Sequence, residues 1–434
     1  MLNQKEFNTR RLKLMAAMGE GVAIIPTAPE ATRNRDSHYP YRFDSHFYYL
    51  TGFPEPESIL VLVSGSDPKS ILFCRDKDME REIWDGFRHG PSGALKEFGM
   101  DEAYPLSKFD EIAYALLSDQ PRLFYSLGSN PDMDERLTVW LKNLRSQGRS
   151  GLSAPDEVVD VLKLVDEMRL FKSSHEVEIM KRSAAIAAGA HRRAMRFTKP
   201  NMMEYEVEAE FLHEFYRKGA QFPAYTSIVA SGPNACTLHY NANNAILKEG
   251  ELLLIDAGCE LDGYASDITR TFPISGKFTS PQKDLYELVL AAQASAIAKV
   301  HPDYRWNDPH EAALDTLIRG FIDFGLCKGS PEEVRETGSY RQFYMHRTGH
   351  WLGLDVHDVG EYKDKEGSWR RLQPGMTLTV EPGCYVRPAE NVPEHFWNIG
   401  IRIEDDALVT SDGCEIITGD APKEIAEIES WMQR

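Results

Sequence analysis

The 434-residue sequence lacks the marks of several protein classes. It has no run of about eighteen apolar residues, so we expect no membrane-spanning helix. Its six cysteines are scattered and form no C-x-x-C pair, which favours reduced thiols over disulfides or a thiolate zinc site. Basic residues do not balance acidic ones: 49 Lys and Arg against 67 Asp and Glu give a net charge of −18. That deficit argues against nucleic acid or an anionic membrane as the main partner.

The amino-terminal sequence also lacks the pattern of a secretory leader. In MLNQKEFNTRRLKLMAAMGEGVAII the charges are spread out, and no apolar core precedes a small-residue cleavage site. We therefore expect a cytoplasmic protein. The composition is otherwise globular, with 42% hydrophobic and 27% charged residues, and the length predicts two domains.

The first part of the chain alternates strand-like and helix-like segments. The spacing of apolar residues predicts strands at 21–28, 47–53, 58–65, 70–75 and 122–128. It predicts helices near 3–18, 107–118 and 132–145. This alternation indicates a smaller α/β domain, which we place at residues 1–170.

The remaining residues, 171–434, have a different pattern. A long helix is expected at 174–196, with Ser173 or Ser174 as its N-cap and Glu176 in its first turn. Further helices are expected near 203–218, 281–299 and 309–324. The strand-like runs between them are ELLLIDAGCE, YASDITRTFPI, MTLTVEPGCYV and GIRIEDDALVT. This order predicts an α+β domain whose antiparallel sheet is covered by helices.

Two aspartates flank a predicted hairpin in the second domain. Asp256 ends an apolar run, Asp267 follows on the next strand, and Asp262-Gly263 between them favours a tight turn. Pairing the strands about this turn places both carboxylates on one face, roughly 5 Å apart. Two carboxylates that close repel each other unless a proton or a metal lies between them.

A second carboxylate pair has a similar setting. Glu381 ends a β-branched run that Pro382 and Gly383 interrupt, and Glu404 is expected inside another strand. Arg402, two residues before Glu404, should share its face and offset acidic charge. Carboxylates at strand ends are usually only solvated, but two such pairs in one domain favour a site.

A histidine-rich segment, HRTGHWLGLDVHD, offers nitrogen ligands. Its histidines are His346, His350 and His357, and His239 is a fourth candidate elsewhere. The segment lacks the H-E-x-x-H pattern of zinc helices, and its glycines indicate a loop and strand. A lone histidine is more often a packing residue, but three within twelve positions favour a site. We expect His350 to complete a metal set and the others to bond substrate.

Four carboxylates and one imidazole suit two adjacent hard or borderline divalent cations. Such oxygen-rich sites favour Mn²⁺, whereas a zinc-selective site would carry more His or Cys. Two metals about 3.5–4 Å apart can share a hydroxide and polarise a carbonyl, which suits amide hydrolysis.

These residues, in this order and context, resemble the ligand motifs of the pita-bread metallopeptidases, and within them the aminopeptidase P (Xaa-Pro aminopeptidase) family. The matching motifs are LLLIDAGCE, YASDITRTFP, HRTGHWLGLDVHDVG, TVEPGCY and IRIEDD. The resemblance extends over nearly the whole chain and includes RFDSHFYYLTGFPEPESILVLV near the amino terminus. It implies an enzyme that removes the first residue of peptides with proline second.

The resemblance also implies a role for each site residue. Asp256 and Asp267 would bind one metal or bridge the pair, His350 would complete the other site, and Glu381 and Glu404 would bind or bridge. A metal-bridging hydroxide would attack the carbonyl, and Glu381 would relay its proton. The remaining implied roles are stabilisation of substrate and intermediate by His239 and His357, shaping of the proline pocket by His346, and ordering of the site by Arg402 and Tyr385.

The amino-terminal domain carries no ligand motif of its own. By resemblance it would cap the cleft and mediate self-association as a homodimer or homotetramer. Trp84 and Arg88 resemble the family segment that reaches a neighbouring subunit's site, and the alternative is a buried Trp beside a surface Arg. The segment Arg347-Thr348-Gly349 receives no role.

Several alternatives remain open. A prolidase would share all five ligands but cleave only dipeptides, and a non-catalytic pita-bread scaffold would bind protein partners instead. A creatinase-like enzyme would not need the metal ligands. Mn²⁺, Co²⁺, Fe²⁺ and Zn²⁺ can all occupy such ligands, so the sequence leaves the metal open.

Overall fold

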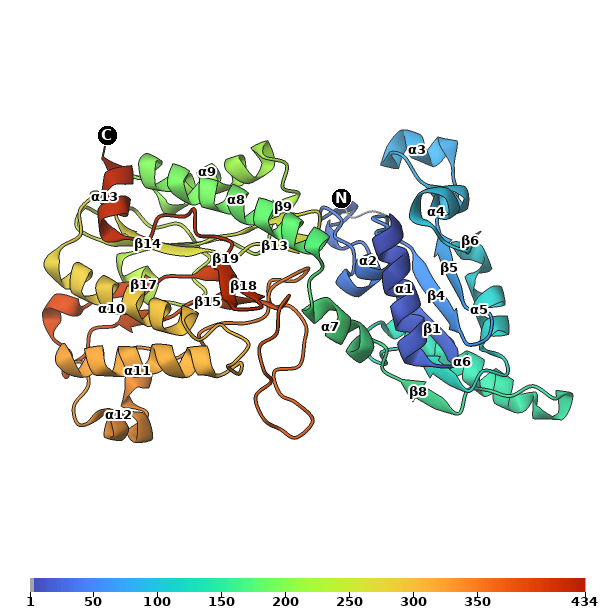
Figure 1. The fold of residues 1–434 in the computed structure, drawn as a ribbon. Helices are drawn as coiled ribbons and strands as arrows, with labels where there is room; N and C mark the ends of the chain where they lie inside the picture. Colours follow the sequence, from blue (N-terminus) through green and yellow to red (C-terminus); the bar gives the residue numbers. More distant parts are fainter. Residues whose placement is uncertain (1–3, 434) are drawn as a thin grey trace. The chain divides into compact units, whose positions relative to one another are not determined.

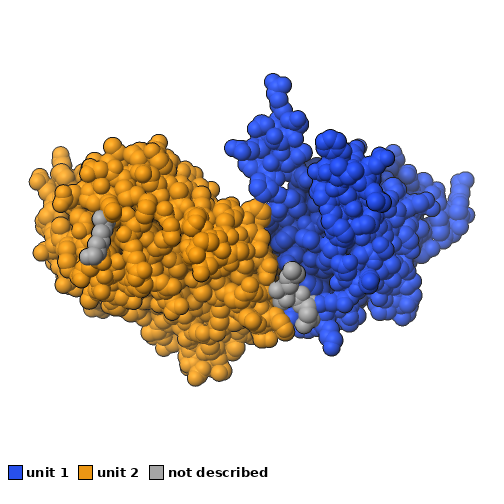
Figure 2. Space-filling view, turned by 90° about the horizontal axis from the view of Figure 1, so that it is seen from above, with its two compact units in different colours: residues 1–169 blue, residues 170–434 orange. Residues whose placement is uncertain are grey.

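The computed structural model describes residues 4–433, which form two compact units that meet in sequence between Arg169 and Leu170 (Figures 1 and 2). Whether they are independent domains with the predicted boundary after residue 170 stays a prediction. No helix in the described range is both long and apolar enough to cross a membrane.

The first unit is built on a mixed six-stranded sheet in the order β6-β5-β4-β1-β7-β8. Its strands are β1 (Gly21–Pro26), β4 (Ile59–Ser64), β5 (Lys69–Cys74), β6 (Glu102–Pro105), β7 (Arg122–Phe124) and β8 (Glu157–Val159), with a separate hairpin of β2 (Thr32–Asn34) and β3 (Ser37–His38). Its helices are α1 (Gln4–Met18), α2 (Ser45–Thr51), α3 (Met79–Asp85), α4 (Gly90–Phe98), α5 (Phe109–Leu117), α6 (Pro131–Ser146) and α7 (Leu162–Leu170). Alternate apolar residues of β1, β4 and β5 pack with those of α5 and α6 in one core. The residues between them, such as Ala23, Leu60 and Leu72, are also buried, so both faces of the sheet are covered and its strands read as continuous apolar runs.

The strand predicted at 47–53 is wrong, because this segment forms helix α2. The Asp44 carboxylate caps it by accepting a hydrogen bond from the Phe47 N–H at 2.8 Å. Gly52 ends it in the left-handed conformation, at φ 66°. The two caps outweigh the strand preference of the aromatic residues between them.

The second unit places a sheet region between helices. The helices are α8 (Ser174–Phe197), α9 (Glu204–Arg217), α10 (Ser280–Ile297), α11 (Asp308–Asp323), α12 (Pro331–Thr337) and α13 (Ile425–Met432). The strands are β9 (Phe222–Pro223), β10 (Ile228–Ser231), β11 (Leu252–Asp256), β12 (Cys259–Leu261), β13 (Tyr264–Ala265), β14 (Thr269–Pro273), β15 (Thr377–Val380), β16 (Gly383–Val386), β17 (Ile399–Arg402), β18 (Asp405–Thr410) and β19 (Gly413–Ile416). In Figure 1 the α8 and α9 pair lies on one side of these strands and the α10 and α11 pair on the other.

Strand register sets the position of the four carboxylates. In the β11–β14 pair Asp256 lies opposite Thr269, so Asp267 is diagonal to Asp256 rather than opposite it. The β15–β18 and β16–β17 pairs share one register, which places Glu381 opposite Glu404. Asp267 and Glu404 were both predicted inside strands, but Asp267 lies between β13 and β14, and Glu404 lies in the break between β17 and β18. Both carboxylate pairs thus occupy strand ends.

The start of α8 provides a test of the local sequence reading. Ser173 is the cap: its hydroxyl accepts from the Glu176 N–H, and the Glu176 carboxylate accepts from the Ser173 N–H, at 3.3 and 2.9 Å.

Ser173→Ala should destabilise the second unit by about 1 kcal/mol, because one amide loses its partner. Calorimetry would show a lower melting temperature for that unit. The matched control Ser174→Ala should stay within about 0.5 kcal/mol of wild type; equal effects would contradict the assignment.

Candidate metal centre

The five predicted ligands meet in the second unit. They line a cavity of about 810 Å³ together with His239, His346, His357 and Arg402. Ligand atoms of Asp267, His350 and Glu404 all lie within 4.8 Å of one another. Residues up to 148 positions apart thus converge because strand ends β11, β14, β15 and β17 point to one place.

The His350 ring is oriented for metal binding. Its Nδ1 lies 2.9 Å from the Trp351 carbonyl, which can only accept, so Nδ1 carries the proton. The other ring nitrogen, Nε2, lies 3.4 Å from Asp267 and 3.8 Å from Glu381, on the side where a metal ion would bind. A backbone partner on the far nitrogen is how proteins fix the tautomer of a metal-binding histidine.

The other carboxylates are held by neutral and cationic donors. Thr269 Oγ1 donates to Glu404 at 2.6 Å, and Arg402 donates to Asp256 at 2.7 Å. Arg402 also bonds Thr269 Oγ1 at 3.2 Å and is 4% exposed. The buried Arg402 guanidinium therefore links β11, through Asp256, to β14, through Thr269.

Burial disturbs the protonation of the cluster. It raises the pKa of Glu381 to about 7 and the pKa values of Asp256 and Glu404 above their ordinary range. Burial alone would lower the pKa of His350, but Asp267 and Glu381 raise it to about 9. The five ligand side chains thus bring an excess of negative charge into a buried site. Four carboxylates with one imidazole are a ligand set that fits hard or borderline divalent cations.

Tyr225 is a site residue that the sequence reasoning missed. Its hydroxyl lies 2.6 Å from Asp256 Oδ1 and also donates to Asp267 Oδ1. Burial and the two carboxylates raise the phenol pKa far above its usual value, so the hydroxyl stays a donor. Tyr225 follows no motif spacing, and only the fold brings it to the pair.

His346 is held by protein groups rather than left free. Its Nδ1 donates to the Arg347 carbonyl at 2.7 Å, and its Nε2 accepts from the Tyr385 hydroxyl at 2.8 Å. Arg402 in turn donates to that hydroxyl at 3.0 Å. Burial and Arg402 lower the pKa of His346 to about 3, so the ring is neutral. With both nitrogens engaged, His346 can shape the cavity wall but does not offer a free donor to substrate.

The other two histidines face the cavity. The His357 ring packs edge-on against His350 at 4.4 Å, and burial together with His350 lowers its pKa. His239 is exposed within the cavity lining.

Trp84 and Arg88 belong to the first unit, and their role stays a prediction. The alternative of a buried tryptophan is wrong, because Trp84 is 84% exposed.

The segment Arg347-Thr348-Gly349 lies against strand β15. The Thr348 carbonyl accepts from the Glu381 N–H at 2.8 Å, and the His350 carbonyl accepts from the Thr379 N–H at 2.9 Å. A Cβ on Gly349 would lie 2.0 Å from the Thr379 carbonyl oxygen, so this close approach requires glycine. The segment therefore fixes two ligands relative to each other.

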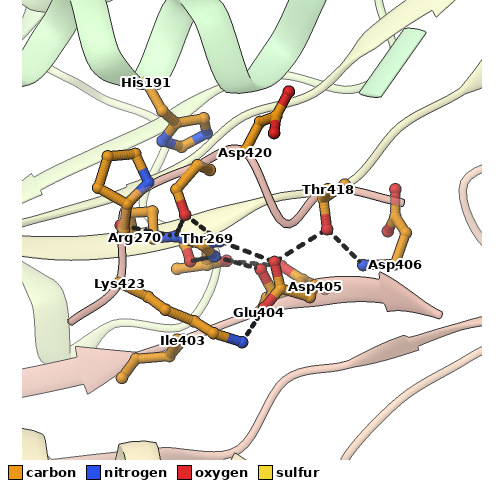
Figure 3. A network of polar contacts seen from close by, with 12 residues as sticks. His191, Thr269, Arg270, Ile403, Glu404, Asp405, Asp406, Thr418, Asp420 and Lys423 are labelled. Carbon is orange, nitrogen blue, oxygen red and sulfur yellow. Dashed lines mark hydrogen bonds and ion pairs between the residues drawn. The ribbon is translucent and has the colours of Figure 1, made fainter. Parts of the chain in front are cut away.

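A buried network of charged residues lies next to the predicted metal ligand Glu404 (Figure 3). Arg270 is fully buried and pairs with Asp405 at 2.7 Å, while Lys423 reaches the other Asp405 oxygen at 2.7 Å. Burial would raise the pKa of Asp405, but the two cations lower it to about 2. Arg270 also donates to the Glu404 carbonyl at 2.5 Å, so the network holds a ligand's backbone.

Residues 178–411 match the family model for metallopeptidase family M24, and residues 7–125 match that for the aminopeptidase P N-terminal domain. The chain belongs to metallopeptidase family M24. It is 43% identical to the Xaa-Pro aminopeptidase of Escherichia coli (strain K12) over 99% of this chain and 98% of that protein. It is 34% identical to Xaa-Pro aminopeptidase 3 of Homo sapiens, covering 99% of this chain and 86% of the relative.

Solved structures agree with this M24 membership. The structure of Pseudomonas aeruginosa aminopeptidase PepP matches with a TM-score of 0.97 at 48% identity, covering 99% of this chain and 98% of that one. Zn-substituted E. coli aminopeptidase P in complex with product matches with a TM-score of 0.96 at 42% identity, over 99% and 98% of the two chains. The predicted fold, an α+β pita-bread unit after a smaller α/β unit, is confirmed, as is the assignment to a metal-dependent peptidase family.

Metal binding by this M24 centre should depend on pH. Because Glu381 and His350 have pKa values of about 7 and about 9 in the free protein, a cation must displace protons to bind. Apparent Mn²⁺ affinity should therefore rise from about pH 6 to about pH 8, with release of roughly one proton or more per ion. Isothermal titration in two buffers of different ionisation enthalpy measures both quantities. Constant affinity without proton release would mean that Glu381 and His350 are already deprotonated in the free protein.

Proposed function

We propose that this M24 peptidase is an Xaa-Pro aminopeptidase, which releases the first residue of peptides with proline at the second position. The observation that carries the proposal is the convergence of all five ligands and three histidines on one cavity. Support comes from relatives named Xaa-Pro aminopeptidase that align over 98% or more of both chains.

The centre would hold two divalent ions through Asp256, Asp267, His350, Glu381 and Glu404. Four oxygen donors to one nitrogen favour Mn²⁺ over Zn²⁺. When bound, the metal pair supplies a hydroxide nucleophile and polarises the scissile carbonyl.

The chain's own groups would bind, orient and move protons. Glu381 lines the cavity beside the other carboxylates, so it is placed to accept a proton and return it to the departing nitrogen. His239 and His357 line the cavity and can donate to the substrate carbonyl. Arg402 orders Asp256 and Tyr385 by direct hydrogen bonds.

Selectivity for proline follows from amide chemistry. A bond to proline has no N–H, so a wall that offers no acceptor rejects ordinary amides by leaving their donor unpaired. His346 suits such a wall, because the hydroxyl of Tyr385 occupies its only acceptor nitrogen.

Asp267→Ala tests the metal centre. It removes a ligand from the cluster, so activity on an Arg-Pro-Pro peptide should fall about 1,000-fold or more, with fewer metal ions bound per chain. Steady-state kinetics and elemental analysis of the purified protein give the two readouts, and Mn²⁺, Co²⁺ and Zn²⁺ reconstitution compares the metals. The control Asp284→Ala changes an exposed aspartate on α10 and should behave as wild type. Near-normal turnover by Asp267→Ala would contradict the metal mechanism.

Substrate length separates this function from a prolidase. An Xaa-Pro aminopeptidase should cleave tripeptides and longer peptides with proline second, because its cavity must admit residues beyond proline. A prolidase would turn over only the dipeptide. A wild-type enzyme restricted to dipeptides would therefore contradict the proposal.

We also propose that the chain self-associates through the first unit. Around α3, four large apolar side chains are exposed: Met79 and Ile83 at 80%, Trp84 at 84% and Phe87 at 64%. Such a cluster is unusual on a monomer and typical of an interface. Arg88 pairs with Asp85 beside it at 3.2 Å.

Light scattering after size exclusion tests this assembly. The wild-type chain should run as a dimer or tetramer, and Trp84→Ser should shift the population towards smaller species by about tenfold in dissociation constant. Val139→Ser, which alters an exposed residue of α6, is the matched control. A monomeric wild-type chain would contradict the proposal.

A further inference from the structure

Glu204 is a buried acidic residue with a role that the metal centre does not use. It is the first residue of α9, is fully buried, and its carboxylate accepts five hydrogen bonds from neutral donors. Oε1 accepts from the Ser231 N–H at 2.7 Å, the Ser231 hydroxyl at 2.8 Å and Asn234 Nδ2 at 3.1 Å. Oε2 accepts from the Tyr240 hydroxyl at 2.7 Å and the Ala245 N–H at 2.9 Å.

These donors lie on both sides of His239. Ser231 and Asn234 precede it, and Tyr240 and Ala245 follow it. The Glu204 N–H also donates to the Ala245 carbonyl at 3.0 Å, so the far end of the segment is held twice. One residue of α9 therefore fixes both ends of the 231–245 segment.

The segment needs such an anchor. Residues 237–245 lie in neither a helix nor a strand, so no ladder of backbone bonds sets their path. His239 is exposed to the cavity, and in the described part of the chain its ring makes no side-chain hydrogen bond. Its position therefore depends strongly on the path of the backbone. Asn243 adds a second support on β10 by bonding the Val229 N–H and the Ser227 carbonyl, at 3.0 and 2.8 Å.

We infer that Glu204 is a positioning residue, which fixes the 231–245 segment so that His239 meets the substrate at the right place. The inference rests on the proposed role of His239. A misplacement of about 1 Å at a catalytic group can reduce rate about 100-fold, so the anchor matters for chemistry although it does not touch substrate.

Glu204→Gln tests the anchor with little change in shape. The carboxamide has one oxygen and one NH₂ group, and that NH₂ must face donors that it cannot satisfy. We expect kcat/KM on an Xaa-Pro peptide to fall about 10- to 100-fold, with Mn²⁺ affinity within about threefold of wild type. The matched control is Glu206→Gln, in the same helix turn, whose carboxylate accepts one hydrogen bond within residues 4–433, from the Met203 N–H at 2.7 Å. That control should lose less than about threefold.

A double-mutant cycle separates positioning from general stability. In an His239→Ala background, Glu204→Gln should reduce kcat/KM by less than about threefold, because the group that it positions is already gone. The same loss in both backgrounds would overturn the inference. If Glu204→Gln does not fold, Tyr240→Phe removes one of the five donors and gives the milder form of the same test.

Hydrogen–deuterium exchange tests the anchor without any reaction. Amides of residues 232–246 should exchange faster in Glu204→Gln than in wild type or Glu206→Gln, with no peptide or metal added. Unchanged exchange in this segment would overturn the inference. A wild-type chain that cleaves no Xaa-Pro peptide would contradict the proposed function instead, and the exchange result would still decide whether Glu204 holds the segment.

Discussion

Four carboxylates converge in a buried part of the second unit, and their mutual repulsion is the constraint that the surrounding structure answers. Removing a carboxylate from water costs several kcal/mol unless partners offset it. Arg402 pairs with Asp256, and the Tyr225 hydroxyl lies within hydrogen-bond distance of both aspartates. Thr269 donates to Glu404, and His350 faces Asp267 and Glu381. Each carboxylate thus has a neighbouring donor, and the residual excess of negative charge is what a divalent cation would neutralise.

A second group of buried charges, which does not line the cavity, holds the backbone of the predicted ligand Glu404. Arg270, Asp405 and Lys423 form a closed set of charges without contacting the cavity, and Arg270 binds the Glu404 carbonyl (Figure 3). A buried ion pair adds little net stability on its own, because desolvation offsets its attraction. Its geometric effect is larger here, since it sets the path of the backbone at the break between β17 and β18. The cluster therefore depends on charges that no substrate or metal would meet.

The sequence predicted the parts of this arrangement that local chemistry determines. Asp262-Gly263 located the first hairpin, the serine before α8 located a helix start, and the motif order identified the ligand set. Prediction from the sequence failed where tertiary contacts determine the local structure. The aromatic run at 47–53 reads as a strand until Asp44 and Gly52 are seen to cap it. Tyr225 and Glu204 carry no spacing signal, because Asp256 and Ser231 lie 31 and 27 residues further along the chain. These partners come near only when β10 pairs with β11 and α9 packs against β10.

The four carboxylates and His239 are held in position by different kinds of contact. The carboxylates sit at strand ends, where ladder hydrogen bonds on both sides limit backbone movement. His239 sits on an irregular segment, where the chain has no such ladder and buried side chains, Glu204 above all, supply the equivalent bonds. A carboxylate is suited to that task, because its two oxygens can accept about four hydrogen bonds or more from converging backbone and side-chain donors. Acidic residues thus serve this site twice, as metal ligands on strands and as an anchor for a loop.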